Sequence, residues 1–505
     1  MRLSSPDLST LPRCFGRPAL ALPASVLAAA VLAACGGGGG DSTPPPPVVT
    51  VSSAPTLEAD GRIVFAVALN EPSPKGVTLS YSTSDLSPTL AAKAIPGYAR
   101  GGAACGTGID YVSATNVALP IAAGASTGSI TVVTCNDATF QANKKFTLTV
   151  NGGASPVVAA ATIVNDEVGG LNDTGIATCV DANGAAAACP AAGLPGQDAQ
   201  TGRDALAVTQ SPADGLAGFS YAKVGAAGES LAASATAWSC VRDAVTGLLW
   251  QVEPSVAVPS ALPYASVQAR VDAANAARLC GVATWRVPEV AELSSLVNSG
   301  KTTGVAMDSA WFADTAGLGN QAASLYWSAT TFPADTQTAW VVDFSIGAIG
   351  VKNTASGSGN ALALRLVSGA AQSVSSAAPC TVGGAINPAT DRYLDNGDGT
   401  ITDKTTQLMW MQCSLGQSGA ACATGAPTAA SWSAALGAAA SVNADAAGLG
   451  KGYSDWRLPN RNELGSIVDR ACRSPSVNSA YFPERGWQVT GPVHRRKSSP
   501  KPRGS

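Results

Sequence analysis

The sequence predicts an exported multidomain protein in which an all-β antiparallel sandwich is followed by two copies of a domain that mixes strands and helices. Three observations lead to this prediction. The first residues have the layout of a secretory signal. Short runs of alternating apolar and polar residues follow over residues 49–168, as is typical of β-strands. Beyond residue 171, one set of motifs occurs twice, which indicates a duplicated domain.

Residues 1–35 resemble a lipoprotein signal peptide. Three arginines precede an apolar run from Ala19 to Leu32, which is too short for a comfortable membrane span. The run leads into Leu32-Ala-Ala-Cys35, which is similar to a bacterial lipobox and implies that Cys35 carries the lipid. Ordinary cleavage at a small-residue site, with Cys35 incidental, is the other interpretation.

Residues 36–48 predict a tether between the lipid and the first domain. Five glycines give a flexible stretch, and four consecutive prolines then favour a semi-rigid spacer. Gly36 directly follows Cys35, and the absence of Asp there resembles the outer-membrane sorting pattern of Gram-negative bacteria. We therefore expect a protein anchored to the outer membrane through its lipid, on the periplasmic face or at the cell surface.

The composition argues against a nucleic-acid partner. Only 13% of the residues are charged, against about 25% in a typical domain, and the net charge is −3. Such a chain lacks the excess of basic residues with which proteins bind the phosphates of nucleic acid. Nothing in the composition decides whether the chain forms an oligomer.

The cysteines predict disulfides. Of the twelve, Cys14 lies in the signal and Cys35 takes the lipid, which leaves an even number for an oxidising compartment. A zinc site is disfavoured because the chain has no Cys-x-x-Cys and only one His. The economical pairing is local, with the last pair assigned by elimination: Cys105 with Cys135, Cys179 with Cys189, Cys240 with Cys280, Cys413 with Cys422, and Cys380 with Cys472.

Residues 49–168 predict a sandwich of antiparallel strands. Short alternating runs at residues 62–69, 77–82, 128–134, 145–150 and 157–164 are separated by turn residues, without helical periods. The landmarks of this segment resemble a Calx-beta domain. They are Gly108-Ile-Asp-Tyr111, Ala123-Gly124, Phe146-Thr-Leu-Thr149 and Ile163-Val-Asn-Asp-Glu167.

The Calx-beta resemblance implies calcium binding by acidic loop residues at one end of the sandwich. Calcium prefers several hard oxygen ligands. An acidic pair of the family is replaced here by Gln141 and Lys144, so the site looks degraded and a spacer sandwich is the alternative. The residues that fall where the ligands would be are Glu58, Asp110, Asp137 and Asp166.

Residues 171–370 hold the complete first copy of the duplicated domain. After a loop-rich lead-in, alanine-rich residues 264–280 have helical spacing, and Pro288 begins a short helix. Its ordered motifs resemble the Lcl C-terminal domain family. They are Thr246-Gly-Leu-Leu-Trp250, Trp285-Arg-Val-Pro-Glu-Val-Ala-Glu-Leu293, Tyr326-Trp-Ser-Ala-Thr330, Ala339-Trp-Val-Val-Asp-Phe344 and Arg365-Leu-Val367.

This second resemblance implies a C-type-lectin-like α+β fold, surface exposure and, for the family's named member, adhesion to glycosaminoglycans. Trp285, Arg286, Trp327 and Ser328 could form a stacking wall with a guanidinium, suited to a sugar ring or an anionic group. In the other interpretation, which we favour, they are core. Recognition then belongs to the polar loops at residues 252–263, 299–308, 314–324 and 348–361.

Residues 380–483 hold a second, incomplete copy. It contains Asp403-Lys-Thr-Thr-Gln-Leu-Met-Trp410 and Trp456-Arg-Leu-Pro-Asn-Arg-Asn-Glu-Leu464. The closing motifs of the first copy have no counterpart after Pro483. Instead, residues 484–505 form a basic tail, expected to be disordered, which could otherwise bind an anionic surface polymer.

These features predict a non-enzymatic surface lipoprotein whose lectin-like domains serve adhesion or the recognition of a ligand, such as a glycan. The repeated motifs contain no nucleophile, metal cluster or phosphate loop. An envelope spacer or assembly protein without a ligand is the alternative. A catalyst is the third interpretation, because this superfold also hosts enzymes.

Overall fold

The computed structural model of the chain is mostly β, with several small sheets and few helices. Pro46–Ser505 form one compact unit by their contacts. Within the part of the chain that the structure describes, no helix is both long and apolar enough to cross a membrane. The structure describes residues 45–483, except residues 89–96, 140, 166, 168–169, 210, 212–213, 216, 254–259, 316–323, 356–359, 371–391 and 471–475.

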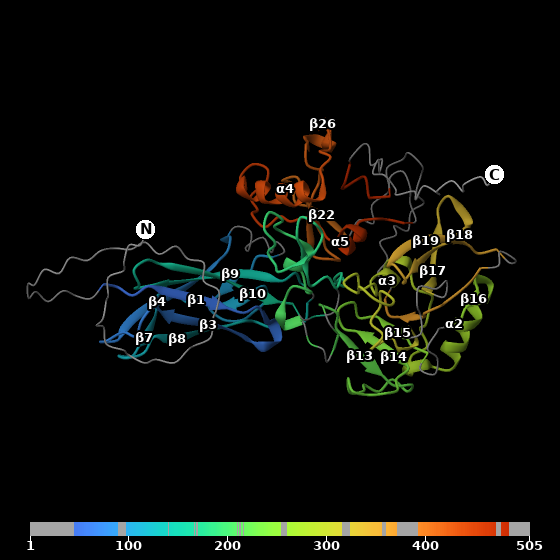
Figure 1. Cartoon of the computed structure of the whole chain (residues 1–505), viewed down its shortest axis with the longest axis horizontal. Coiled ribbons are helices and arrows are strands. Elements are labelled where there is room, and N and C mark those ends of the chain that lie inside the picture. The colour runs from blue at the N-terminus through green and yellow to red at the C-terminus, as the bar shows by residue number, and fades with distance from the viewer. Residues whose placement is uncertain are drawn as a thin grey trace, which may run out of the picture. The chain divides into compact units, whose positions relative to one another are not determined.

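The predicted sandwich consists of two antiparallel layers (Figure 1). One sheet has the order β1-β3-β8 and the other β2-β10-β9-β4-β7, with β2 parallel to β10. Alternate residues of β3 are buried, as the period of two requires. The core between the layers includes Phe65, Leu79, Phe146 and Leu148. The strands are β1 (Val49–Ser53), β2 (Thr56–Leu57), β3 (Arg62–Leu69), β4 (Val77–Asp85), β5 (Gly101–Gly102), β6 (Tyr111–Val112), β7 (Val117–Ile121), β8 (Thr127–Val133), β9 (Lys144–Asn151) and β10 (Val157–Val164).

The first copy packs two sheets around helices α2 and α3. One sheet has the order β13-β14-β15-β21, in which β21, the last strand of the copy, pairs with β15 (Figure 1). Strands β17-β18-β19 form a second sheet, against which α3 lies. The lead-in contributes the short hairpin β11 (Cys179–Val180) and β12 (Ala186–Ala187). The elements of the copy are β13 (Tyr221–Val224), β14 (Cys240–Asp243), β15 (Leu249–Gln251), β16 (Leu262–Pro263), α2 (Val267–Ala276), α3 (Val290–Ser294), β17 (Leu325–Phe332), β18 (Asp335–Asp343), β19 (Ala348–Asn353), β20 (Ala361–Leu362) and β21 (Val367–Ser368).

The second copy repeats the first half of this design. Strands β22-β23-β24 and helices α4 and α5 correspond in order to β13-β14-β15, α2 and α3. Even the ring packing recurs, because Tyr221–Phe312 and Tyr393–Phe482 both meet edge to face, at 5.4 and 5.5 Å. The elements are β22 (Tyr393–Asp395), β23 (Thr400–Asp403), β24 (Leu408–Met411), β25 (Gln417–Ser418), β26 (Thr424–Gly425), α4 (Trp432–Ala444) and α5 (Arg461–Ser466).

Four of the five predicted disulfides are present in the structure. They are the pairs Cys105–Cys135, Cys179–Cys189, Cys240–Cys280 and Cys413–Cys422. The fifth, between Cys380 and Cys472, lies outside the described residues. So do the signal with Cys35, residues 36–44 of the tether and the basic tail at 484–505.

Candidate functional site

The tryptophans considered as either a binding wall or core lie inside the first copy, in line with the interpretation that the sequence favoured. Trp285 is 2% exposed, and Trp327 and Ser328 are fully buried. Each polar group has an internal acceptor, since the Trp285 indole donates to the Leu279 carbonyl at 3.0 Å and the Trp327 indole to that of Leu262 at 2.9 Å. The Ser328 hydroxyl donates to the Trp340 carbonyl at 2.6 Å. These three side chains therefore have no surface to offer a ligand.

Arg286 is committed to a structural ion pair. Its guanidinium donates to both oxygens of Glu292, at 2.7 and 2.6 Å, and also to the Gly369 carbonyl. Hydrogen bonding to Glu292 raises the pKa of Arg286. Glu292 also accepts from the Glu289 amide at 2.8 Å, which completes a capping box at the start of α3. The pair fixes the turn between Trp285 and the helix.

The second copy repeats this network with different neighbours. Arg457 pairs with Glu463, which accepts from the Asn460 amide at 2.8 Å. In each copy, an Asn of the helix before the Trp-Arg turn forms hydrogen bonds with the backbone of the tryptophan. Asn275 exchanges two hydrogen bonds with Trp285, at 3.0 and 2.7 Å, and Asn443 does so with Trp456, at 2.8 Å each. The repeated Trp-Arg-x-Pro motif thus has the same structural role in both copies.

The predicted calcium ligands of the sandwich surround a lysine. The Lys144 ammonium lies 2.5 Å from an Asp110 oxygen and also donates to Gln141. Gln141 in turn donates to Asp137 at 2.5 Å. Burial, together with the charges of Glu167 and Asp137, raises the pKa of Glu58 to about 7. Asp166 lies outside the described residues.

The described part of this donor set does not fit calcium. Calcium takes six to eight oxygen ligands, and its affinity depends on how many of them are charged. Here the ammonium of Lys144 already provides the positive charge beside Asp110, and it would repel a cation placed among these carboxylates. Lys144 thus neutralises Asp110 among the expected ligands.

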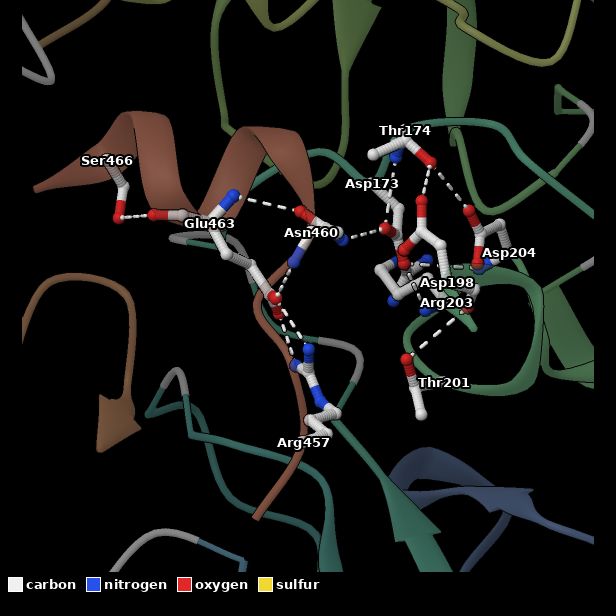
Figure 2. Close-up of polar contacts among 10 residues, drawn as sticks. All are labelled: Asp173, Thr174, Asp198, Thr201, Arg203, Asp204, Arg457, Asn460, Glu463 and Ser466. Carbon is white, nitrogen blue, oxygen red and sulfur yellow. Dashed lines mark hydrogen bonds and ion pairs between the residues drawn. The ribbon is translucent and has the colours of Figure 1, made fainter. Parts of the chain in front are cut away.

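The sequence did not single out the most unusual polar site. It lies in the lead-in to the first copy, the segment between β10 and β13. Asp173, Asp198 and Asp204 each direct a carboxylate oxygen to within 4.8 Å of the others (Figure 2). Asp173 is 5% exposed and Asp204 2%. Asp173 accepts four hydrogen bonds, from the amides of Thr174, Arg203 and Asp204 and from the Asn460 side chain.

The electrostatics of this cluster favour a bound proton or cation. Burial and then the charge of Asp198 raise the pKa of Asp173 to about 6. Burial and then Asp173 raise the pKa of Asp204 to about 9. The Thr174 hydroxyl lies 2.5 Å from Asp198 and 3.2 Å from Asp204, but its single hydrogen can serve only one of them. The three carboxylates could hold a divalent cation, or Asp204 can carry a proton.

The cluster joins the two copies. On one side, the Asn172 amide donates to Asp243 of β14 at 2.5 Å. On the other, Asn460 at the start of α5 donates to Asp173 at 2.8 Å, and Asn462 donates to the carbonyls of Asn172 and Asp173 (Figure 2 shows Asn460). The lead-in, which the sequence presented as loop-rich, thus contacts the scaffold of both domains.

Comparison with known proteins supports the domain content. Residues 239–368 and 399–499 each match the model of the Lcl C-terminal domain. Both segments begin within the sheets described above, and the second runs beyond the described residues. No curated protein matches the chain.

Solved structures resemble the chain over about a quarter of its length. The apo form of the Calx CBD1 domain has 14% identity, covers 24% of this chain and 98% of that one, and has a TM-score of 0.17. CBD12 from CALX1.2 has 16% identity, 26% and 48% coverage and a TM-score of 0.18. A two-domain protein of unknown function from Bacteroides fragilis has 8% identity, 23% and 39% coverage and a TM-score of 0.15. Scores this low support no argument about this chain.

Proposed function

We propose that this protein is a lipid-anchored extracytoplasmic binding protein that catalyses no reaction, with its Lcl-like domains as recognition modules. The two matches to the Lcl C-terminal domain suggest a surface or extracellular protein. Four disulfides between cysteines close in sequence suit an oxidising compartment. The lipobox-like Leu32-Ala-Ala-Cys35 supports an anchor in the outer membrane.

The observation that carries the proposal is the structural role of the shared motif, which is buried in the first copy and forms the same Arg–Glu and Asn–Trp contacts in the second. Side chains such as Trp285, Trp327 and Glu292 hold the scaffold, so what differs between domains is the loops. Polar loops on a rigid scaffold are where binding residues concentrate. The sequence assigned recognition to loops at residues 252–263, 299–308, 314–324 and 348–361, but the last range contains strand β19 (Ala348–Asn353), and Val252, Met307 and Asp314 are buried. We assign ligand recognition, with a glycan as the expected class, to the rest of these ranges, parts of which lie outside the described residues.

A glycan array tests the recognition function. The probe is the exported chain with Cys35→Ser, which removes the lipid but leaves all the folded domains. We expect selective binding that is lost when residues 316–323 are replaced by a Gly/Ser loop of equal length. The replacement keeps buried Asp314, Thr315 and Ser324, so the unfolding temperature should stay unchanged. Arg286→Lys is the matched scaffold variant and should lower stability while it leaves glycan selectivity unchanged. A chain that is folded but binds no glycan would favour the spacer alternative.

Membrane fractionation tests the anchor. We expect the wild-type chain to sediment with outer membranes and to incorporate labelled palmitate. Cys35→Ser should abolish the label and release the chain in soluble form. Cys14→Ser, which alters the signal but not the lipobox, is the control and should behave as wild type. Labelled palmitate retained in Cys35→Ser would contradict the assignment.

A further inference from the structure

One end of the sandwich holds an amine and a carboxyl group in contact. Asp110 directly precedes β6, and Lys144 is the first residue of β9. The Lys144 Nζ atom lies 2.5 Å from the Asp110 Oδ1 atom, and the two side chains are 17% and 7% exposed. The fold thus keeps both groups in place and largely withdrawn from water. Two groups held in contact react without the entropy cost of a bimolecular encounter.

The carboxyl group of Asp110 is also fixed through its other oxygen. The Oδ2 atom accepts a hydrogen bond from the Arg100 amide at 2.7 Å, which leaves Oδ1 beside Lys144. The backbone of Asp110 is paired as well, since its amide donates to the Arg100 carbonyl at 2.8 Å and its carbonyl accepts from the Cys135 amide at 2.9 Å. A backbone amide directed at a carboxyl oxygen stabilises the negative charge that develops there when a nucleophile attacks the carbon.

A second buried carboxyl group, that of Glu58, lies within electrostatic reach of this pair. Glu58 is 4% exposed, and its charge interacts with those of Asp110 and Lys144. The aromatic neighbours of the pair in sequence, Tyr111 and Phe146, stack at 4.2 Å and are at most 1% exposed. An acid in such a water-poor place can carry a proton between two reacting groups.

We propose that Lys144 and Asp110 join spontaneously through an amide bond between Nζ and Cγ, which links β9 covalently to the segment before β6. The Lys144 ammonium first passes a proton to the Asp110 carboxylate by way of Glu58. The neutral Nζ then attacks Cγ, a C–N bond forms, and Oδ1 departs as water with two hydrogens that come from Nζ. The balance needs no oxidant, reductant or co-reactant, and the proposal does not depend on ligand recognition by the Lcl-like domains.

Burial supplies the driving force for this condensation. In the sandwich the alternative to the amide is an ion pair withdrawn from water, and the desolvation of two charges is costly. The amide replaces both charges by one neutral group and releases a water molecule. It would close a loop similar to that of the Cys105–Cys135 disulfide, with sequence separations of 34 and 30 residues. Unlike the disulfide, it would persist in a reductant.

Mass spectrometry of a tryptic digest tests the proposal. The sample is the exported chain with Cys35→Ser, unfolded, reduced and alkylated, so that the disulfides do not contribute to the mass. The sequence has no Lys or Arg between Arg100 and Lys144, so trypsin releases both partners in one peptide. We expect this peptide to extend to Lys145, uncut after Lys144, and to be lighter by one water, a loss that fragmentation locates to Asp110 and Lys144.

Three variants separate the amide from an ordinary ion pair. Lys144→Arg keeps the positive charge beside Asp110, but a guanidinium stays protonated and does not attack a carboxyl group. Its peptide should end at position 144 and have its full mass. Lys145→Arg, at the neighbouring position on β9, is the matched control and should still lose the water. Glu58→Gln cannot carry the proton and should leave a large fraction of the chain unlinked.

The wild-type digest decides the matter without any variant, so the test does not depend on how the variants fold. A wild-type peptide of full mass that is cut after Lys144 would overturn the proposal. A loss of ammonia located to Gln141, whose side chain also contacts Lys144, would do so too, because the lysine would then be joined to another partner. A loss of water that persists in Lys144→Arg would exclude the lysine as its source. Complete linkage in Glu58→Gln would contradict the role of Glu58.

Discussion

Asp204 carries the strongest electrostatic perturbation among the charged groups of the acidic cluster. It is buried beside Asp173, and both have a pKa above the usual value of about 4 for Asp. Two carboxylates this close cannot both be ionised without a compensating charge. At neutral pH we expect Asp204 to be protonated. Its carboxyl group then forms a hydrogen bond with the Thr174 hydroxyl, whose oxygen lies 3.2 Å from a carboxyl oxygen of Asp204.

The cluster should make stability depend on pH. The pKa values of folded Asp173 and Asp204, about 6 and about 9, lie above those of the unfolded chain. Their contribution is therefore complete below about pH 4 and is lost as the pH rises through 6 and then 9. We expect the unfolding temperature to fall between about pH 5 and pH 9, by about 2–4 °C for each kcal/mol lost.

Asp204→Asn tests this dependence, because the amide has the shape of the protonated acid and does not ionise. The variant should match the wild type at pH 5 and exceed it at pH 9 in thermal unfolding. Equal slopes for the two proteins would contradict the account. If calcium stabilises the wild type at pH 8 but not the variant, a cation rather than a proton holds the three carboxylates together.

Lys144 should stabilise the sandwich in place of a metal. Its ammonium is the charge partner of buried Asp110, and its side chain is 17% exposed. Lys144→Met removes that partner, which for buried pairs costs about 3 kcal/mol or more. Urea unfolding should show this loss, whereas Lys145→Met, at the exposed neighbouring position on β9, should change little. Equal stability of the two variants would mean that Asp110 does not depend on Lys144.

At the scale of elements, the turn before α3 is held by the Arg286–Glu292 pair. The Glu292 side chain is fully buried in that pair and also caps the helix. Glu292→Gln keeps an acceptor for the Glu289 amide but loses the charge, and Glu292→Ala loses both. We expect the free energy of unfolding to fall in that order, by about 3 kcal/mol or more for Ala. Equal losses would show that the cap contributes nothing.

The strands could be predicted from the sequence because their burial follows a simple period. Arg62–Leu69 and Val157–Val164 have the predicted bounds, since alternate side chains enter one core. The helix expected over residues 264–280 is shorter. A tight turn at Tyr264–Ser266 precedes α2, which ends at Ala276, and Arg278 and Cys280 have a left-handed backbone. The disulfide of Cys280 with Cys240 fixes this departure from the helix.

The candidate sites were harder to predict. Tryptophan suits both a core and a binding face, so only the structure places Trp285 and Trp327 inside. The acidic cluster has no spacing motif, because loops rather than one element bring Asp173, Asp198 and Asp204 together. In contrast, the role of Lys144 could be inferred from the sequence. A cation among expected carboxylates changes the net charge of the site whatever the exact geometry.

At the scale of the whole molecule, duplication has produced two domains with one scaffold but different closure. The ion pairs, clamped tryptophans and ring contacts recur in both. The closing segment, residues 366–368, is described only in the first copy, where it pairs with β15. Among the described residues, β24 is therefore an edge strand of the second copy, whereas β15 in the first has β21 beside it. The C-type-lectin-like fold of these domains stays a prediction.

Hydrogen exchange measured by mass spectrometry tests this central claim most directly. The Gln251 amide is bonded to the closing segment, and Met411 holds the same position in β24, which has no outer neighbour among the described residues. We expect residues 249–251 to exchange slowly and residues 408–411 to exchange much faster. Equal, slow exchange of both strands in the free chain would contradict the account, because the second copy would then already be closed.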